Sequence, residues 1–302
     1  MCLSRPWISC AAVSFLCVAN VYAQGDEIER IAESIRSAPD VPTVRQGMAE
    51  LVEIDSAAAA TAFANELVRI EENLDREREE TLVPYLSLIF DFTDTADIRQ
   101  SLLPTFERLL EGEVRDSESL YLSAALAKFG AQEKVQWLID EYRQSNSLGY
   151  IARAFELLCR TNQDQAVRFV VEEAVQSFDP NVKLRTERCL REMGNPASLE
   201  LMRRWIGVES RDTDQSVVEQ YLESIILFGD SRDLEFLEWL DTNVSIIYGP
   251  DEPRITPAIE TARVSIEERT GTRLPLALTV SVILLLGILI IGFAIYRRRQ
   301  SG

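Results

Sequence analysis

The chain has 302 residues, of which 46% are hydrophobic and 26% charged, so it can bury a sizeable core. Its 49 acidic residues outnumber the 31 basic ones, and the formal charge of −18 argues against nucleic acid or an anionic membrane surface as the main partner. The sequence contains no histidine. This excludes Ser-His and Cys-His catalytic arrangements and removes a common zinc ligand.

The N-terminal segment is typical of an export signal. Arg5 precedes an apolar run from Ile8 to Val18, and Val21-Tyr22-Ala23 then ends in the pattern of a cleavage site. A retained membrane helix would need roughly 18 apolar residues, more than this run supplies. We therefore predict a cleaved signal peptide over residues 1–23 and export of the domain that follows.

The C-terminal segment predicts a membrane anchor. Leu276–Tyr296 is a stretch of 21 residues without a charge, which as a helix reaches about 31 Å, enough for a hydrocarbon core. Arg297–Arg299 follow, and such a basic cluster stays on the cytoplasmic side. We predict a membrane helix over residues 274–296 and a short cytoplasmic tail over 297–302. The arrangement also resembles the C-terminal sorting signals of bacterial surface proteins, so retention and processing both remain open.

Between these ends, residues 24–273 show helical periodicity interrupted every thirty-odd residues by Pro or Gly at a turn. Four units superimpose, the second and third at successive shifts of 32 residues and the fourth after a further 35. Their common apolar position in the first helix is Leu126, Leu158, Leu190 and Ile225. Their common turn residue, where a helix ends in a left-handed conformation, is Gly130, Asn162, Gly194 and Gly229.

The third unit carries a family resemblance. It contains Val182-Lys183, Cys189-Leu190, Met193-Gly194-Asn195-Pro196 and Leu199. This pattern resembles a HEAT repeat of the short bacterial type, with Lys and Asn replacing the usual Arg and Asp. The resemblance implies an all-α, armadillo-like α-solenoid in which each helix pair buries its apolar face only against its neighbours. A globular helical bundle and tetratricopeptide repeats are the alternatives.

The ends of the repeat region follow the same pattern more loosely. We expect helix pairs at Val44–Ile70 and Val83–Leu110, and a single final helix at Pro257–Gly271. A helix over Asp26–Arg36 should cap the first end, because three isoleucines share one of its faces. These are Ile28, Ile31 and Ile35.

No catalytic, metal or cofactor site is expected. Adjacent carboxylates such as Glu172 and Glu173 point to different sides of a helix, so we interpret most of them as solvated and this pair as a possible contact for a basic partner. Several arginines in neighbouring repeats are expected to pair with acids rather than to bind phosphate or carboxylate ligands. They are Arg153, Arg160, Arg168, Arg185, Arg188 and Arg191.

Two further features bear on function. The segment Asn243–Thr256 contains two prolines and carries Ile246, Ile247 and Tyr248 outside helical spacing, which predicts a loop that docks a partner or folds back over the end of the repeats. Cys159 and Cys189 remain after removal of the signal, and we favour two separate thiols over a disulfide because they occupy different positions in the repeat.

These features together favour a binding protein over an enzyme. Without Arg5 and the terminal arginines, 27 basic residues face 49 acidic ones, a net charge of −22. A solenoid with this charge should bind a protein partner with a basic surface and no nucleic acid. We expect a single-pass membrane protein whose exported domain, in the bacterial periplasm or outside the cell, scaffolds an envelope complex. A carboxylate-dependent hydrolase or lyase and a purely structural spacer are the alternatives.

Overall fold

The computed structural model describes residues 24–75, 80–206, 214–249 and 253–271. These residues are helical or in turns, and they contain no β-strand, in agreement with the predicted all-α class. The chain divides into two compact units, residues 1–173 and 174–302. The predicted signal peptide, membrane helix and basic tail lie outside the described residues. Among the helices that are described, none combines the length and the apolar character needed to cross a bilayer.

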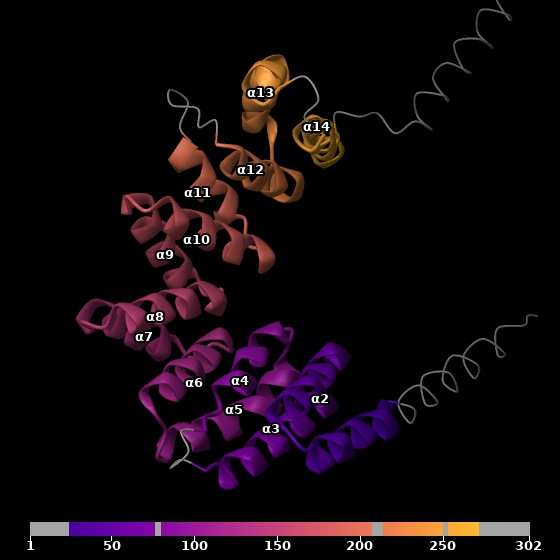
Figure 1. Ribbon diagram of the computed structural model, residues 1–302, viewed down its shortest axis with the longest axis vertical. Coiled ribbons are helices and arrows are strands. Elements are labelled where there is room, and N and C mark those ends of the chain that lie inside the picture. Colours follow the sequence, from indigo (N-terminus) through magenta and orange to yellow (C-terminus); the bar gives the residue numbers. More distant parts are fainter. Residues whose placement is uncertain (1–23, 76–79, 207–213, 250–252, 272–302) are drawn as a thin grey trace, which may run out of the picture. The chain divides into compact units, whose positions relative to one another are not determined.

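In the first unit most helices pack against near neighbours in the chain (Figure 1). A helix over residues 24–37 is followed by α2 (Val41–Ile54), α3 (Ala57–Glu72), α4 (Val83–Leu86), the 3-10 helix η2 (Ser87–Asp91), α5 (Ala96–Glu111), α6 (Asp116–Lys128), α7 (Gln132–Gln144), α8 (Leu148–Thr161) and α9 (Asp164–Gln176). The short helices α4 and η2 contact α2 and α6. Contacts also join α2 to α3, α3 to α5, α5 to α6, α6 to α7, and both α6 and α7 to α8. This is the neighbour-to-neighbour packing expected of helical repeats.

The second unit continues in the same manner. It contains α10 (Pro180–Glu192), α11 (Ala197–Ile206), α12 (Gln215–Phe228), the 3-10 helix η3 (Ser231–Asp233), α13 (Leu234–Ile247) and α14 (Ile255–Thr270). The helix α10 contacts α11 and α12, and α14 contacts α12 and α13 (Figure 1). One apolar cluster runs through α11, α12, α13 and α14 and forms the core of this unit.

The predicted repeat register is confirmed by the helix pairs α6–α7, α8–α9, α10–α11 and α12–α13. The apolar position that the four first helices share is at most 2% exposed in every pair: Leu126, Leu158, Leu190 and Ile225. The residues that the alignment placed on one buried seam are therefore buried in the structure.

Three of the four predicted turn residues are left-handed, with φ of +108° at Gly130, +55° at Asn162 and +71° at Gly194. Gly229 differs, because its φ is −57° and its backbone is extended. A Cβ atom there would lie 2.6 Å from the carbonyl oxygen of Ile225. Glycine is needed at this turn for close approach to the preceding helix rather than for a positive φ.

The expected N-terminal cap is present. The three isoleucines predicted to share a face are all buried: Ile28, Ile31 and Ile35. The helix over residues 24–37 approaches α2 closely at Gly47, where an added Cβ would lie 2.5 Å from Cγ1 of Ile35. The absence of a side chain at Gly47 thus sets how near the two helices come.

The pair predicted at Val83–Leu110 is less regular than expected. Its first member is only the four-residue α4 followed by η2. Leu88, Ile89 and Phe90 are consecutive and all buried. A surface α-helix buries only one stripe of residues, so three consecutive buried residues do not suit it. This run instead forms a 3-10 turn that is enclosed by its neighbours.

Two buried charged side chains of α6 hold this irregular segment. The carboxylate of Glu118 accepts hydrogen bonds from the backbone N–H of Leu82 at 2.9 Å and from the hydroxyl of Thr81 at 3.1 Å. The ammonium of Lys128 donates to the carbonyl oxygens of Phe90 and Phe92, each at 2.6 Å. Burial lowers the pKa of Lys128 to about 8.

Candidate functional site

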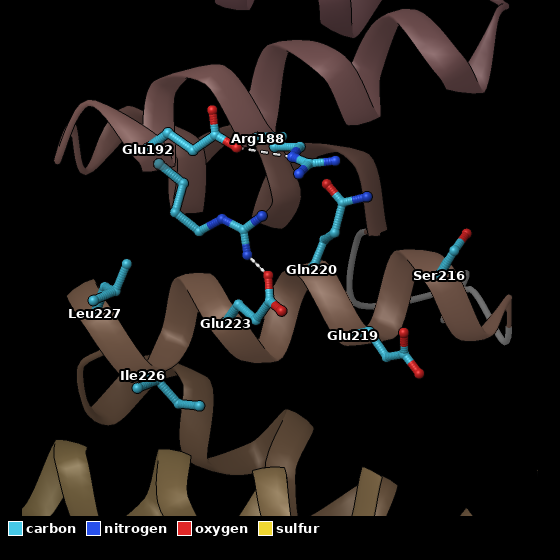
Figure 2. A pocket seen from close by; sticks show the side chains of 9 residues that line it. Arg188, Glu192, Ser216, Glu219, Gln220, Glu223, Ile226 and Leu227 are labelled. Atoms are coloured by element: carbon cyan, nitrogen blue, oxygen red, sulfur yellow. Dashed lines mark hydrogen bonds and ion pairs between the residues drawn. The ribbon is translucent and has the colours of Figure 1, made fainter. Parts of the chain in front are cut away.

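The second unit contains an open groove of about 670 Å³ between α10 and α12 (Figure 2). We call it the α10–α12 groove. It is lined by Arg188, Arg191, Glu192, Ser216, Glu219, Gln220, Glu223, Ile226 and Leu227. Because α10 and α12 contact each other, the lining side chains come from two packed helices rather than from loops.

The charges in the groove are paired. On α10, Arg188 donates to the carboxylate of Glu192 at 2.8 Å (Figure 2). Arg191 reaches across to the carboxylate of Glu223 on α12. Glu219, also on α12, lies 3.3 Å from the guanidinium of Arg254. Except for Arg191, these side chains are at least 30% exposed, so the pairs are open to exchange with the charges of a ligand.

Glu187 of α10 contacts two of the residues that line the groove but is itself fully buried. The hydroxyl of Ser224 donates to its carboxylate, the amide of Gln220 donates at 2.6 Å, and Nε of Arg191 lies 3.4 Å away. Burial nevertheless raises the pKa of Glu187 to about 7, because desolvation outweighs the stabilisation of the charged form by Ser224 and Arg191.

One end of the groove is apolar. Ile226 and Leu227 lie in the last turn of α12, and Leu227 is 51% exposed. The end of this helix is held by the guanidinium of Arg269 on α14, which donates to the carbonyl oxygens of Ile225 at 2.8 Å and Gly229 at 3.0 Å. A cation is favourable beside the carbonyl oxygens at the C-terminus of a helix, so Arg269 stabilises the turn that carries the exposed leucine.

The structure separates the residues that the sequence singled out for partner binding. Glu172 is exposed on α9, whereas Glu173 is half-buried and accepts a hydrogen bond from the hydroxyl of Tyr142 at 3.2 Å. The prediction that these carboxylates point to different sides of a helix is therefore confirmed. Neither of them lines the α10–α12 groove.

The loop predicted at Asn243–Thr256 begins later than expected. The helix α13 continues to Ile247, so Ile246 and Ile247 are helical. The side-chain amide of Asn243 donates to the carbonyl oxygen of Trp239 at 2.7 Å, one turn earlier in the helix. Ile246 is 80% exposed, whereas Tyr248 packs against the core of the second unit. The prediction of a loop at Ile246 and Ile247 was thus wrong, and only Ile246 offers a strongly exposed apolar surface.

The arginines are only partly paired with acids. Arg160, Arg188 and Arg191 form the expected ion pairs. Arg153 instead donates to the hydroxyl of Tyr121 at 2.5 Å, and Arg168 to a backbone carbonyl oxygen of its own helix.

The two cysteines are separate thiols in the described part of the chain, as favoured by the sequence. Cys159 is buried and Cys189 is half-buried. In the repeat alignment Cys189 corresponds to Leu157 and Ala125, which are both buried, so its partial exposure departs from the pattern of the other repeats.

Sequence reasoning did not find the α10–α12 groove as a site. The sequence singled out Arg188 and Arg191, but Glu223, the partner of Arg191 on α12, follows some thirty residues later, and only the helix packing brings these two side chains together. Searches of known protein families, of curated proteins and of solved structures each found no match to this chain.

Proposed function

We propose that this chain is a membrane-anchored, HEAT-like helical scaffold whose exported domain binds a protein partner in the bacterial envelope. The observation that carries the proposal is the α10–α12 groove, an open cleft with charged walls and an apolar end on two packed helices. Exchangeable ion pairs beside an exposed leucine suit a polypeptide surface that combines basic and apolar residues. The anchor at Leu276–Tyr296 and the signal peptide at residues 1–23 are parts of the proposal that rest on the sequence.

The overall charge supports the same function. A net charge of −22 over residues 24–275 attracts a basic partner over distances of about a Debye length, which falls from roughly 14 to 4 Å between 0.05 and 0.5 M salt. Association should therefore slow as salt is added, while dissociation changes less.

The enzyme alternative has one observation in its favour. A general acid or base works best with a pKa near neutrality, and Glu187 has one of about 7. Its side chain is fully buried beside Arg191 and Gln220, however, and a reacting group must touch its substrate. We therefore favour the scaffold over a carboxylate-dependent hydrolase or lyase.

The test is crosslinking and affinity purification of the tagged full chain from native membranes. The groove variant reverses two charges on α12, Glu219→Lys with Glu223→Lys. The matched control reverses two charges on α13 outside the groove, Glu235→Lys with Glu238→Lys. We expect one protein recovered with the wild type and the control, and at least about tenfold less with the groove variant.

Two results would contradict the proposal. Equal recovery with both variants would remove the α10–α12 groove as the binding site. Recovery of no protein above background, with the chain intact in the membrane fraction, would favour the spacer alternative.

A further inference from the structure

A second open pocket, of about 540 Å³, lies in the first unit where α7 ends and α6 and α8 begin. We call it the α6–α8 pocket. It is lined by Asp116, Ser119, Trp137, Glu141, Gln144, Ser145, Ser147 and Tyr150. The three helices that supply these residues all contact one another, so the pocket has ordered walls.

The charge in this pocket is unbalanced, unlike that of the α10–α12 groove. Its lining includes two carboxylates, Asp116 and Glu141, and no lysine or arginine. Among the described residues, neither carboxylate forms an ion pair, and Glu141 accepts only a neutral hydrogen bond from the hydroxyl of Tyr150 at 2.9 Å. Burial, Glu141 and Asp116 together hold the pKa of Tyr150 well above its usual range.

The arginines of α7 and α8 nearest in sequence do not supply the missing positive charge. The guanidinium of Arg143 lies over the ring of Phe169, 5.2 Å from its centroid. Arg153 donates to the hydroxyl of Tyr121. The helix termini around the pocket do not decide the sign of a bound charge, because the end of α7 favours a cation and the starts of α6 and α8 favour an anion. The side chains therefore determine which charge the pocket prefers.

The remaining lining fits a guanidinium better than a simple metal or ammonium ion. Trp137 and Tyr150 offer aromatic rings on which a planar cation stacks. Three serine hydroxyls and the two carboxylates offer acceptors for its five N–H donors. We propose that the α6–α8 pocket binds the guanidinium of an arginine side chain presented by a protein partner. That a protein carries the arginine rests on the proposed function.

The proposal is tested with a small probe on the full chain in mild detergent, labelled with 5-fluorotryptophan. The probe is Nα-acetyl-arginine methylamide, and its neutral isostere is the citrulline analogue. We expect the fluorine signal of Trp137 to shift saturably with the arginine probe, with half-saturation at about 1–10 mM, as for a small ligand with few contacts. The signals of Trp205 and Trp239, which belong to the second unit, should not move.

Variants assign the binding to the pocket. Asp116→Asn with Glu141→Gln should raise the half-saturation concentration at least about tenfold. The matched control, Glu111→Gln with Glu133→Gln, removes the same charge from exposed positions outside the pocket and should change it less than about twofold. Helical circular dichroism and thermal melting like those of the wild type show that each variant is folded.

Three results would overturn the proposal that the α6–α8 pocket binds a guanidinium. They are no saturable shift at 50 mM probe, an equal shift with the citrulline analogue, and equal effects of the two variant pairs. Partner capture separates this proposal from the scaffold. If the probe does not bind while a protein is still captured from membranes, the proposal of a guanidinium site is wrong and the scaffold proposal is unaffected. If the probe binds while no protein is captured, the guanidinium site is supported and the scaffold proposal is wrong.

Discussion

Replacement of the buried carboxylate by an amide, Glu187→Gln, should change how the stability of the second unit depends on pH. The pKa of Glu187 is raised from 4.5 to about 7 in the folded protein. Between these values the folded state retains a proton that the unfolded state releases, so the free energy of unfolding falls as pH rises through this window. From the two pKa values, the loss between pH 4.5 and pH 8 is about 3 kcal/mol.

The amide mimics the protonated carboxyl group at every pH. Its oxygen can still accept from the hydroxyl of Ser224, and Gln220 can turn its own amide to accept from the new nitrogen. We therefore expect Glu187→Gln to match the wild type near pH 4.5 and to exceed it by up to about 3 kcal/mol at pH 8.

The assay is urea unfolding of the full chain in mild detergent at pH values from 4.5 to 8, followed by tryptophan fluorescence. Trp205 and Trp239 pack against the core cluster of the second unit and report its unfolding. Glu238→Gln, which neutralises an exposed carboxylate on α13, is the matched control and should keep the pH profile of the wild type. Parallel profiles for the wild type and Glu187→Gln would refute the reasoning, because the buried group would then carry no proton linkage.

Three further substitutions test the packing by thermal melting with circular dichroism. Leu190→Asp should prevent folding of the second unit, because an unpaired charge at a position with no exposure costs several kcal/mol. A melting curve like that of the wild type would mean that the repeat register is wrong. Lys128→Met should cost about 2–3 kcal/mol by leaving two carbonyl oxygens of the segment after α4 without a donor, and Lys134→Met should be nearly neutral. Gly47→Val should cost about 1–3 kcal/mol through its clash with Ile35, and an unchanged melting temperature would show that the two helices can separate freely.

The sequence predicted those parts of the fold that depend on local periodicity. The pairs from α6 to α13 follow from apolar spacing and from turn residues such as Gly130, Asn162 and Gly194, whose left-handed backbone is a local property. The four-residue α4 was missed, because consecutive buried residues carry no helical period. The end of α13 was predicted too early. A proline restricts the backbone of the residue directly before it, so the prolines beyond α13 do not prevent a helix from Asn243 to Ile247.

The candidate sites could not be derived in the same way. The ion pair of Arg191 with Glu223 and the contact of Arg203 with Asp233 join residues about thirty positions apart, so they depend on how successive helices cross. The imbalance of charge around Glu141 becomes visible only once the neighbouring side chains are placed. The sequence supplied the charges, and the helix packing decided which of them have partners.

The central claim, that the exported domain binds a protein through the α10–α12 groove, is tested most directly by site-specific photocrosslinking in intact cells. A photoreactive amino acid replaces Leu227, which is exposed at the apolar end of the groove, or, as control, Glu238, which is exposed on α13 outside it. The account predicts one discrete crosslinked protein from Leu227 and none from Glu238, with less crosslinking as external salt is raised. The claim would be contradicted by the absence of a discrete product at Leu227 while the full chain is present in the membrane.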